Sequence, residues 1–115
     1  MIIEHSNMEK EIRSRMRGGK GDCTVTLLAG HQLQKHCRVF SEIEIPVGAS
    51  IGPHDHTAET EYYIVLEGTG IVDDNGTLVA VKPGDVVVTT DGATHSVEAT
   101  GKVPLKLIAV IVTDA

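Results

Sequence analysis

The chain of 115 residues has little aromatic character, with one Phe, two Tyr and no Trp. Proteins that bind single-stranded nucleic acid stack bases on aromatic rings along a basic groove. A chain with a formal net charge of -6 repels phosphate backbones instead. No apolar run approaches the roughly 20 residues that a membrane-spanning helix needs. We therefore expect a soluble protein with neither a nucleic-acid nor a membrane partner.

Cysteine is scarce as well, because Cys23 and Cys37 are the only two and do not form a C-x-x-C pair. Residues 1–20 contain no apolar leader of the kind that directs secretion. A single domain of this length buries roughly two-thirds of its unfolded surface and folds without disulfides. The sequence thus predicts two reduced thiols and a cytoplasmic location.

Basic residues are few after residue 38. Residues 1–38 hold seven Lys and Arg against four Asp and Glu, whereas residues 39–115 hold three against twelve. We predict a basic N-terminal arm over residues 1–22 and an acidic barrel domain over residues 23–115. The spacing of Met8, Ile12 and Met16 allows a short helix or an irregular arm. The basic residues of this arm form either a solvated face or an anion-binding arm. They are Lys10, Arg13, Arg15, Arg17 and Lys20.

Helical periodicity is absent from residue 23 onward. Short β-rich runs alternate with turn residues, at the spacing of an all-β sandwich or barrel. Asn75-Gly76 lies between two apolar runs and predicts a type I′ hairpin, and Lys82-Pro83-Gly84 predicts the next turn. The expected strands are residues 23–29, 37–45, 50–54, 61–67, 70–74, 77–81, 85–89, 95–99 and 105–113.

The last of these runs is apolar on both faces. Leu107 and Ala109 fall on one face, while Ile108 and Val110 fall on the other. A strand of this kind needs cover on both sides, from a second sheet, the N-terminal arm or another subunit. We predict a homodimer on this basis.

The most informative pattern is G-x5-H-x-H-x4-E-x6-G. It consists of Gly48, His54, His56, Glu61 and Gly68. Alternate strand residues share a face, so His54 and His56 can place two imidazole nitrogens on one ion while Asp55 points away. Glu61 follows after a short connection and can offer a carboxylate from the neighbouring strand. A second run ends in Gly92 and His95, where a tight turn precedes a further strand.

These two motifs resemble those of the cupin superfamily over about residues 38–112. The second motif departs from the usual pattern at Thr90, where proline is common, and at Ala99, where asparagine is common. The resemblance implies a double-stranded β-helix, or jelly roll, of two facing sheets. It also implies that His54, His56, Glu61 and His95 bind one divalent ion. Such ligands suit Mn, Fe, Co, Ni, Cu or Zn, and affinity alone does not select one.

Other residues have candidate roles near this site. Tyr63 lies on the face of Glu61 and either donates its hydroxyl to a bound oxyanion, as a catalytic or orienting residue, or fills the core. Glu59 is either a proton donor at the barrel mouth or a solvated loop carboxylate. Arg38 shares a face with Phe40 and is expected to point outward, so we predict no cationic residue inside the pocket. We expect structural roles for His5, His31 and His36.

Cupins with this ligand set include oxalate-degrading enzymes, dioxygenases, sugar isomerases and epimerases, and proteins without demonstrated chemistry. We predict that the chain binds a small oxygen-rich acid or an enediol at the two free positions of a six-coordinate ion. It would act as an oxalate-decarboxylase-like or dioxygenase-like enzyme, or as a non-catalytic sensor of a small molecule. A third possibility is a metal that only closes the barrel.

Overall fold

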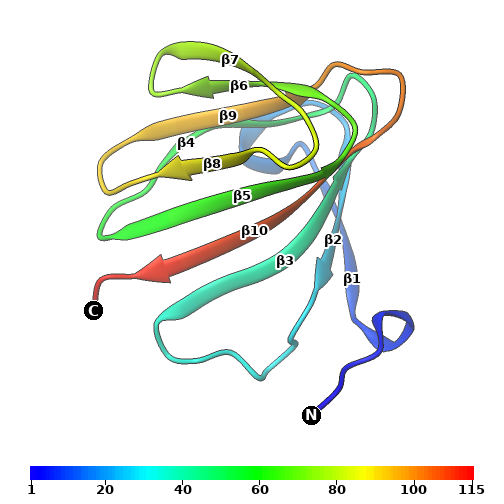
Figure 1. Ribbon diagram of the computed structural model, residues 1–115, viewed down its shortest axis with the longest axis vertical. Coiled ribbons are helices and arrows are strands. Elements are labelled where there is room, and N and C mark those ends of the chain that lie inside the picture. The colour runs from blue at the N-terminus through cyan, green and yellow to red at the C-terminus, as the bar shows by residue number, and fades with distance from the viewer.

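The protein is two antiparallel sheets packed face to face, as seen in a computed structural model that describes residues 1–115 (Figure 1). One sheet has the strand order β1-β2-β3-β10-β5-β8 and the other β4-β9-β6-β7. This confirms the all-β jelly-roll prediction. The strands are β1 (Lys10–Ser14), β2 (Asp22–Leu27), β3 (Cys37–Ile45), β4 (Ser50–Asp55), β5 (Glu59–Glu67), β6 (Gly70–Asp74), β7 (Thr77–Val81), β8 (Val86–Thr89), β9 (Thr94–Ala99) and β10 (Leu105–Thr113).

The turns between strands follow from residues that adopt a positive φ. Asn75 and Gly76 have φ values of 49° and 99° and join β6 to β7, as the hairpin signal predicts. The connection between β4 and β5 is only three residues long, because Ala58 has a φ of 57° and reverses the chain. As a result β5 begins at Glu59, two residues before the expected start.

The strand β10 lies at the centre of the larger sheet, between β3 and β5 (Figure 1). Its inward residues Leu105, Leu107 and Ala109 are at most 1% exposed and pack in the core between the sheets. On its outer face Ile108 and Val110 are half-buried. The second sheet thus covers one apolar face of β10, and the other face remains accessible in the single chain.

The N-terminal segment forms an edge strand rather than a helix. Strand β1 pairs antiparallel with β2, between the short 3-10 turns η1 (His5–Asn7) and η2 (Met16–Gly18). An isolated helix of this length is marginal in water, whereas pairing with β2 satisfies the backbone groups of both strands. Neither three-residue turn is long enough to cross a bilayer.

Three β-bulges interrupt the regular alternation of side chains, and two of them lie in strands that lead to the cavity or the histidine cluster. In the β3–β10 ladder Val39 pairs with Ile111 and Cys37 with Val112, which leaves Arg38 as the extra residue. In the β4–β9 ladder two residues, Gly52 and Pro53, stand opposite the single residue between the paired positions of β9. A bulge re-aims the side chains beside it, and bulges are frequent near functional sites.

The segment around η2 packs closely against β4. A Cβ on Gly52 would lie 2.2 Å from the Arg17 carbonyl oxygen, and one on Gly19 would lie 2.2 Å from the Ser50 oxygen. Only glycine allows this approach. Arg15 and Arg17 have φ values of 49° and 54°, a left-handed conformation that costs roughly 1–2 kcal/mol per residue. The segment is therefore held on the strand that leads to His54.

Candidate metal centre

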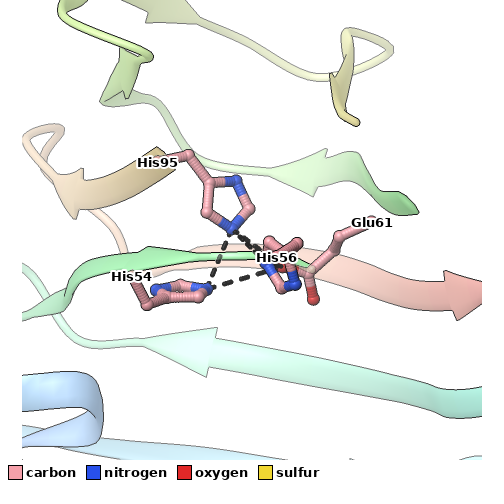
Figure 2. Close-up of side chains that lie close together, drawn as sticks. All are labelled: His54, His56, Glu61 and His95. Atoms are coloured by element: carbon pink, nitrogen blue, oxygen red, sulfur yellow. Dashed lines mark hydrogen bonds and ion pairs between the residues drawn. The ribbon is translucent and has the colours of Figure 1, made fainter. Parts of the chain in front are cut away.

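Four side chains meet between the two sheets. His54 on β4, His56 just after it, Glu61 on β5 and His95 on β9 point toward one another (Figure 2). Their candidate ligand atoms all lie within 4.8 Å of one another. Glu61 Oε1 is 2.8 Å from His95 Nε2, 2.9 Å from His56 Nε2 and 3.6 Å from His54 Nε2. The four residues that the sequence motifs single out are thus brought together.

In two of the imidazoles, the ring nitrogen that points away from the cluster makes a hydrogen bond that fixes the tautomer. His54 Nδ1 lies 2.8 Å from the Gly52 carbonyl oxygen, which can only accept, so Nδ1 carries the proton. His56 Nδ1 in the same way donates to Glu59 Oε2 at 2.5 Å. In the neutral rings, both Nε2 atoms therefore present a lone pair to the centre of the cluster.

These lone pairs are not balanced by protein donors. His95 Nε2 lies 2.9 Å from His54 Nε2 and 3.0 Å from His56 Nε2, and a single N–H cannot serve both of them and Glu61. Glu61 Oε1 is buried, and although three imidazole nitrogens lie within 3.6 Å of it, none makes a hydrogen bond to it. An unsatisfied buried group of this kind costs about 1–3 kcal/mol. Three imidazoles and a carboxylate with converging lone pairs fit a divalent first-row ion.

The ionisation states also suit a cation. Burial acts to raise the pKa of Glu61, but contacts with His54 and His95 outweigh it and lower the pKa to about 2. Burial lowers the pKa of His95, and its Nδ1 lies 2.7 Å from the Thr89 hydroxyl. At neutral pH the carboxylate is ionised and this imidazole is neutral, as metal coordination requires.

Glu59 belongs to the support of this cluster. It accepts hydrogen bonds from Arg38 Nε at 3.0 Å and Nη2 at 2.9 Å, in addition to the bond from His56. The Arg38 guanidinium lowers the pKa of Glu59. The side chain is 12% exposed and lies on β5, so it is not a solvated loop carboxylate. Its position two residues before Glu61, on the same face, was the available sequence signal.

Tyr63 is part of the core and of the site. Its ring stacks on His95 with centroids 4.8 Å apart and 14° between the planes. Burial and the nearby Glu61 charge raise the pKa of Tyr63 well above its usual value, so the hydroxyl remains protonated. The residue also lines the cavity beside the cluster. Both sequence-based alternatives, packing in the core and donation of the hydroxyl to a bound oxyanion, are compatible with this position.

A cavity of about 200 Å³ adjoins three of the four side chains. Three arginines line it together with His54, His56 and Glu61: they are Arg13, Arg17 and Arg38. The expectation of a pocket without cations is therefore wrong. Arg38 faces inward because the β3 bulge breaks the two-residue alternation on which that expectation rests. Arg13 and Arg17 reach the cavity because the N-terminal segment joins the barrel wall.

The remaining histidines lie outside the cluster. His5 Nε2 lies 3.1 Å from Glu42 Oε2, at the surface. Neither His31 nor His36 contributes a side chain to the cavity.

Comparison with known proteins agrees with this arrangement. Residues 41–111 match the family model described as Cupin domain. The chain belongs to the cupin family. This cupin is 40% identical over 113 residues to the "Oxalate-binding protein" of Thermotoga maritima. The aligned residues make up 97% of this chain and 93% of the relative.

Solved structures also share the fold of this cupin. The crystal structure of a "predicted oxalate decarboxylase" from Thermotoga maritima has a TM-score of 0.91 at 39% identity, over 98% of this chain and 99% of that one. The polyketide cyclase RemF from Streptomyces resistomycificus has a TM-score of 0.78 at 21% identity, over 100% of this chain and 80% of that one. A match at that identity shows a shared fold and carries no argument about function.

Proposed function

We propose that this cupin holds a divalent transition metal through His54, His56, Glu61 and His95, and that it binds a small carboxylate at that metal. The observation that carries the proposal is the buried, unpartnered Glu61 Oε1 facing three imidazole nitrogens. A metal bound there would supply Lewis acidity toward the oxygens of the ligand. The ion is one of Mn, Fe, Co, Ni, Cu or Zn.

An acid of the size of oxalate is the favoured ligand. A relative at 40% identity is named an oxalate-binding protein. The cavity of about 200 Å³ has room for roughly six or seven waters at about 30 Å³ each. Its arginines favour an anionic acid over an uncharged enediol. We assign the Tyr63 hydroxyl the role of a donor to the bound acid.

Reversible binding is favoured over turnover. Decarboxylation replaces carbon dioxide by a proton and so needs a proton donor beside the substrate. Glu59 is held by Arg38 and His56. The lowered pKa of Glu61 keeps it ionised, and the raised pKa of Tyr63 makes its hydroxyl a hydrogen-bond donor but a poor acid. The alternative, an oxalate-decarboxylase-like or dioxygenase-like enzyme, would have to draw its proton or oxidant from solvent. A purely structural metal is disfavoured, because a closed site would not adjoin a cavity.

The test is calorimetric titration of oxalate into protein loaded with Mn²⁺, followed by assays of carbon dioxide release and oxygen uptake. We expect saturable binding without turnover, and turnover would favour the enzymatic alternative. His56→Ala should lose both metal and oxalate, whereas the control His36→Ala should retain both. Unchanged metal content and oxalate binding in His56→Ala would contradict the proposal.

We further propose a homodimer formed through the outer face of the larger sheet. Apolar side chains on neighbouring strands lie side by side there, since Val110 is paired with Phe40 on β3 and with Tyr62 on β5. Phe40 is 39% exposed and Tyr62 is 37% exposed. Val88, paired with Tyr62, extends the same face onto β8. A contiguous apolar face of this kind is typical of a subunit interface.

A cytoplasmic location remains part of the proposal. Cys23 and Cys37 are both free thiols, as expected in a reducing compartment. Cys23 is completely buried and packs as a small apolar side chain.

A further inference from the structure

The three arginines that line the cavity differ in their partners. Arg13 Nη2 lies 2.8 Å from Glu11 Oε2, and Arg38 Nη2 lies 2.9 Å from Glu59 Oε2. Arg17 lines the same cavity and makes no ion pair. Two of the three positive charges are therefore balanced within the protein, and the charge of Arg17 is available to a ligand.

The backbone holds Arg17 at this place in a conformation that an arginine rarely adopts. Its φ of 54° is left-handed, and its carbonyl oxygen occupies the space that a Gly52 side chain would need. Gly52 also accepts the hydrogen bond from His54 Nδ1. One glycine thus positions both the imidazole and the arginine segment. Strained residues that the surrounding structure holds in place cluster at binding sites.

Charge balance indicates which ligands this arrangement suits. A divalent ion and the ionised Glu61 sum to one net positive charge when the imidazoles are neutral. A dianionic ligand would leave one net negative charge in a partly apolar cavity, where uncompensated charge is unfavourable. Arg17 supplies the missing positive charge. With a singly charged ligand, the arginine would remain unpaired.

We propose that Arg17 selects dianions at this site by pairing with the negatively charged end of a ligand whose other end is bound at the metal. The ligand class is short dicarboxylates of the size of oxalate. This role of Arg17 rests on the proposed function, because it requires a ligand at the metal. A guanidinium can form two parallel hydrogen bonds with a carboxylate, which gives such a pair a defined geometry.

Two ligands of nearly equal shape separate charge from size: oxalate, and oxamate, in which one carboxylate is replaced by a neutral amide. Affinities for both are measured by calorimetry on the full-length protein loaded with Mn²⁺, and Mn²⁺ content is measured by atomic absorption. The variants are Arg17→Gln and Arg17→Lys. The matched control is Arg15→Gln, because Arg15 has a similar φ of 49° but does not line the cavity.

We expect the wild type and Arg15→Gln to prefer oxalate over oxamate by roughly 10- to 100-fold, as for a hydrogen bond between charged groups. Arg17→Gln should lose most of this preference at unchanged Mn²⁺ content, and Arg17→Lys should regain part of it. Three results would overturn the assignment: an unchanged preference in Arg17→Gln, an equal loss of both ligands, or a fall in Mn²⁺ content. If the metal-loaded wild type binds neither ligand, the proposed function fails first, before any variant is compared.

Discussion

Glu59 Oε2 accepts one hydrogen bond from His56 Nδ1 at 2.5 Å and another from Arg38 Nη2 at 2.9 Å. The carboxylate thereby orients the His56 ring and makes its Nε2 more basic, and partners of this kind typically contribute 10- to 100-fold to metal affinity. We expect Glu59→Ala to weaken Zn²⁺ binding by about that factor. Competition with a chromophoric chelator measures it. Glu9→Ala, at an exposed position, is the control, and equal affinities in the two variants would contradict this role.

Metal removal should lower the thermal stability of the protein. Without a cation, the lone pairs of Glu61 and the imidazoles face one another, and a ligand present at 100 times its Kd stabilises the native state by about 2.7 kcal/mol. For a domain of this size that corresponds to a rise in Tm of roughly 10 °C. Differential scanning calorimetry with and without a chelator checks it. His95→Ala should show no such difference, and an unaltered wild-type Tm would argue against a metal site.

Gly52→Ala should destabilise the fold more than Gly18→Ala. The two glycines separate two kinds of cost. Gly18 has a φ of 78°, but a Cβ there meets nothing within 4 Å. A Cβ at Gly52 would lie 2.2 Å from the Arg17 oxygen. We expect about 1 kcal/mol for Gly18→Ala from its backbone conformation. For Gly52→Ala we expect about 1–3 kcal/mol or more from the forced shift of backbone. Urea unfolding measures both, and the reverse order would show that the segment near Arg17 is not fixed by this contact.

A charge placed on the outer face of the larger sheet should dissociate the proposed homodimer. Val110→Asp introduces a carboxylate between Phe40 and Tyr62, its neighbours on β3 and β5, and an unpaired charge in an apolar interface is strongly unfavourable. Light scattering coupled to size-exclusion chromatography should give a dimer for the wild type at micromolar concentration and a monomer for the variant. Glu98→Asp, on the other sheet, should remain dimeric. A monomeric wild type would remove the proposal.

The two thiols should differ in reactivity. Burial, followed by the neighbouring Asp22 charge, raises the pKa of Cys23, so less thiolate is present at any given pH, and the side chain is fully buried. Cys37 is only partly buried. In mildly alkaline buffer we expect Ellman's reagent to modify Cys37 in the native protein and to modify Cys23 only in concentrated urea. Equal rates for the two native thiols would contradict this expectation.

The sequence predicted the bounds of several strands. The bounds of β3, β6, β7 and β10 agree with the predicted ranges, because each strand is a clear β-rich run ended by turn residues. The ligand cluster was equally predictable from the sequence, since His54, His56 and Glu61 lie close together along the chain and His95 begins a recognisable strand. Local patterns of this kind depend on neighbouring residues and need no knowledge of distant contacts.

Features that depend on distant pairing were not predictable in the same way. The inward direction of Arg38 results from one extra residue in the β3–β10 ladder, and only the partner strand reveals it. Strand β1 forms because β2 offers it an edge, while its own sequence is equally compatible with a helix. The role of Glu59 also depended on Arg38, 21 residues away in the chain.

The participation of β1 and η2 in the cavity wall has a practical consequence for handling this protein. An affinity tag fused to Met1, or a deletion that trims the first twenty residues for crystallisation, would leave all four candidate ligands in place. It would nevertheless disturb or remove the stretch that carries Arg13 and Arg17. Preparations that differ only in the position of the tag would then bind the same metal ion but differ in their affinity for the acid. A C-terminal tag after Ala115 is therefore the safer choice.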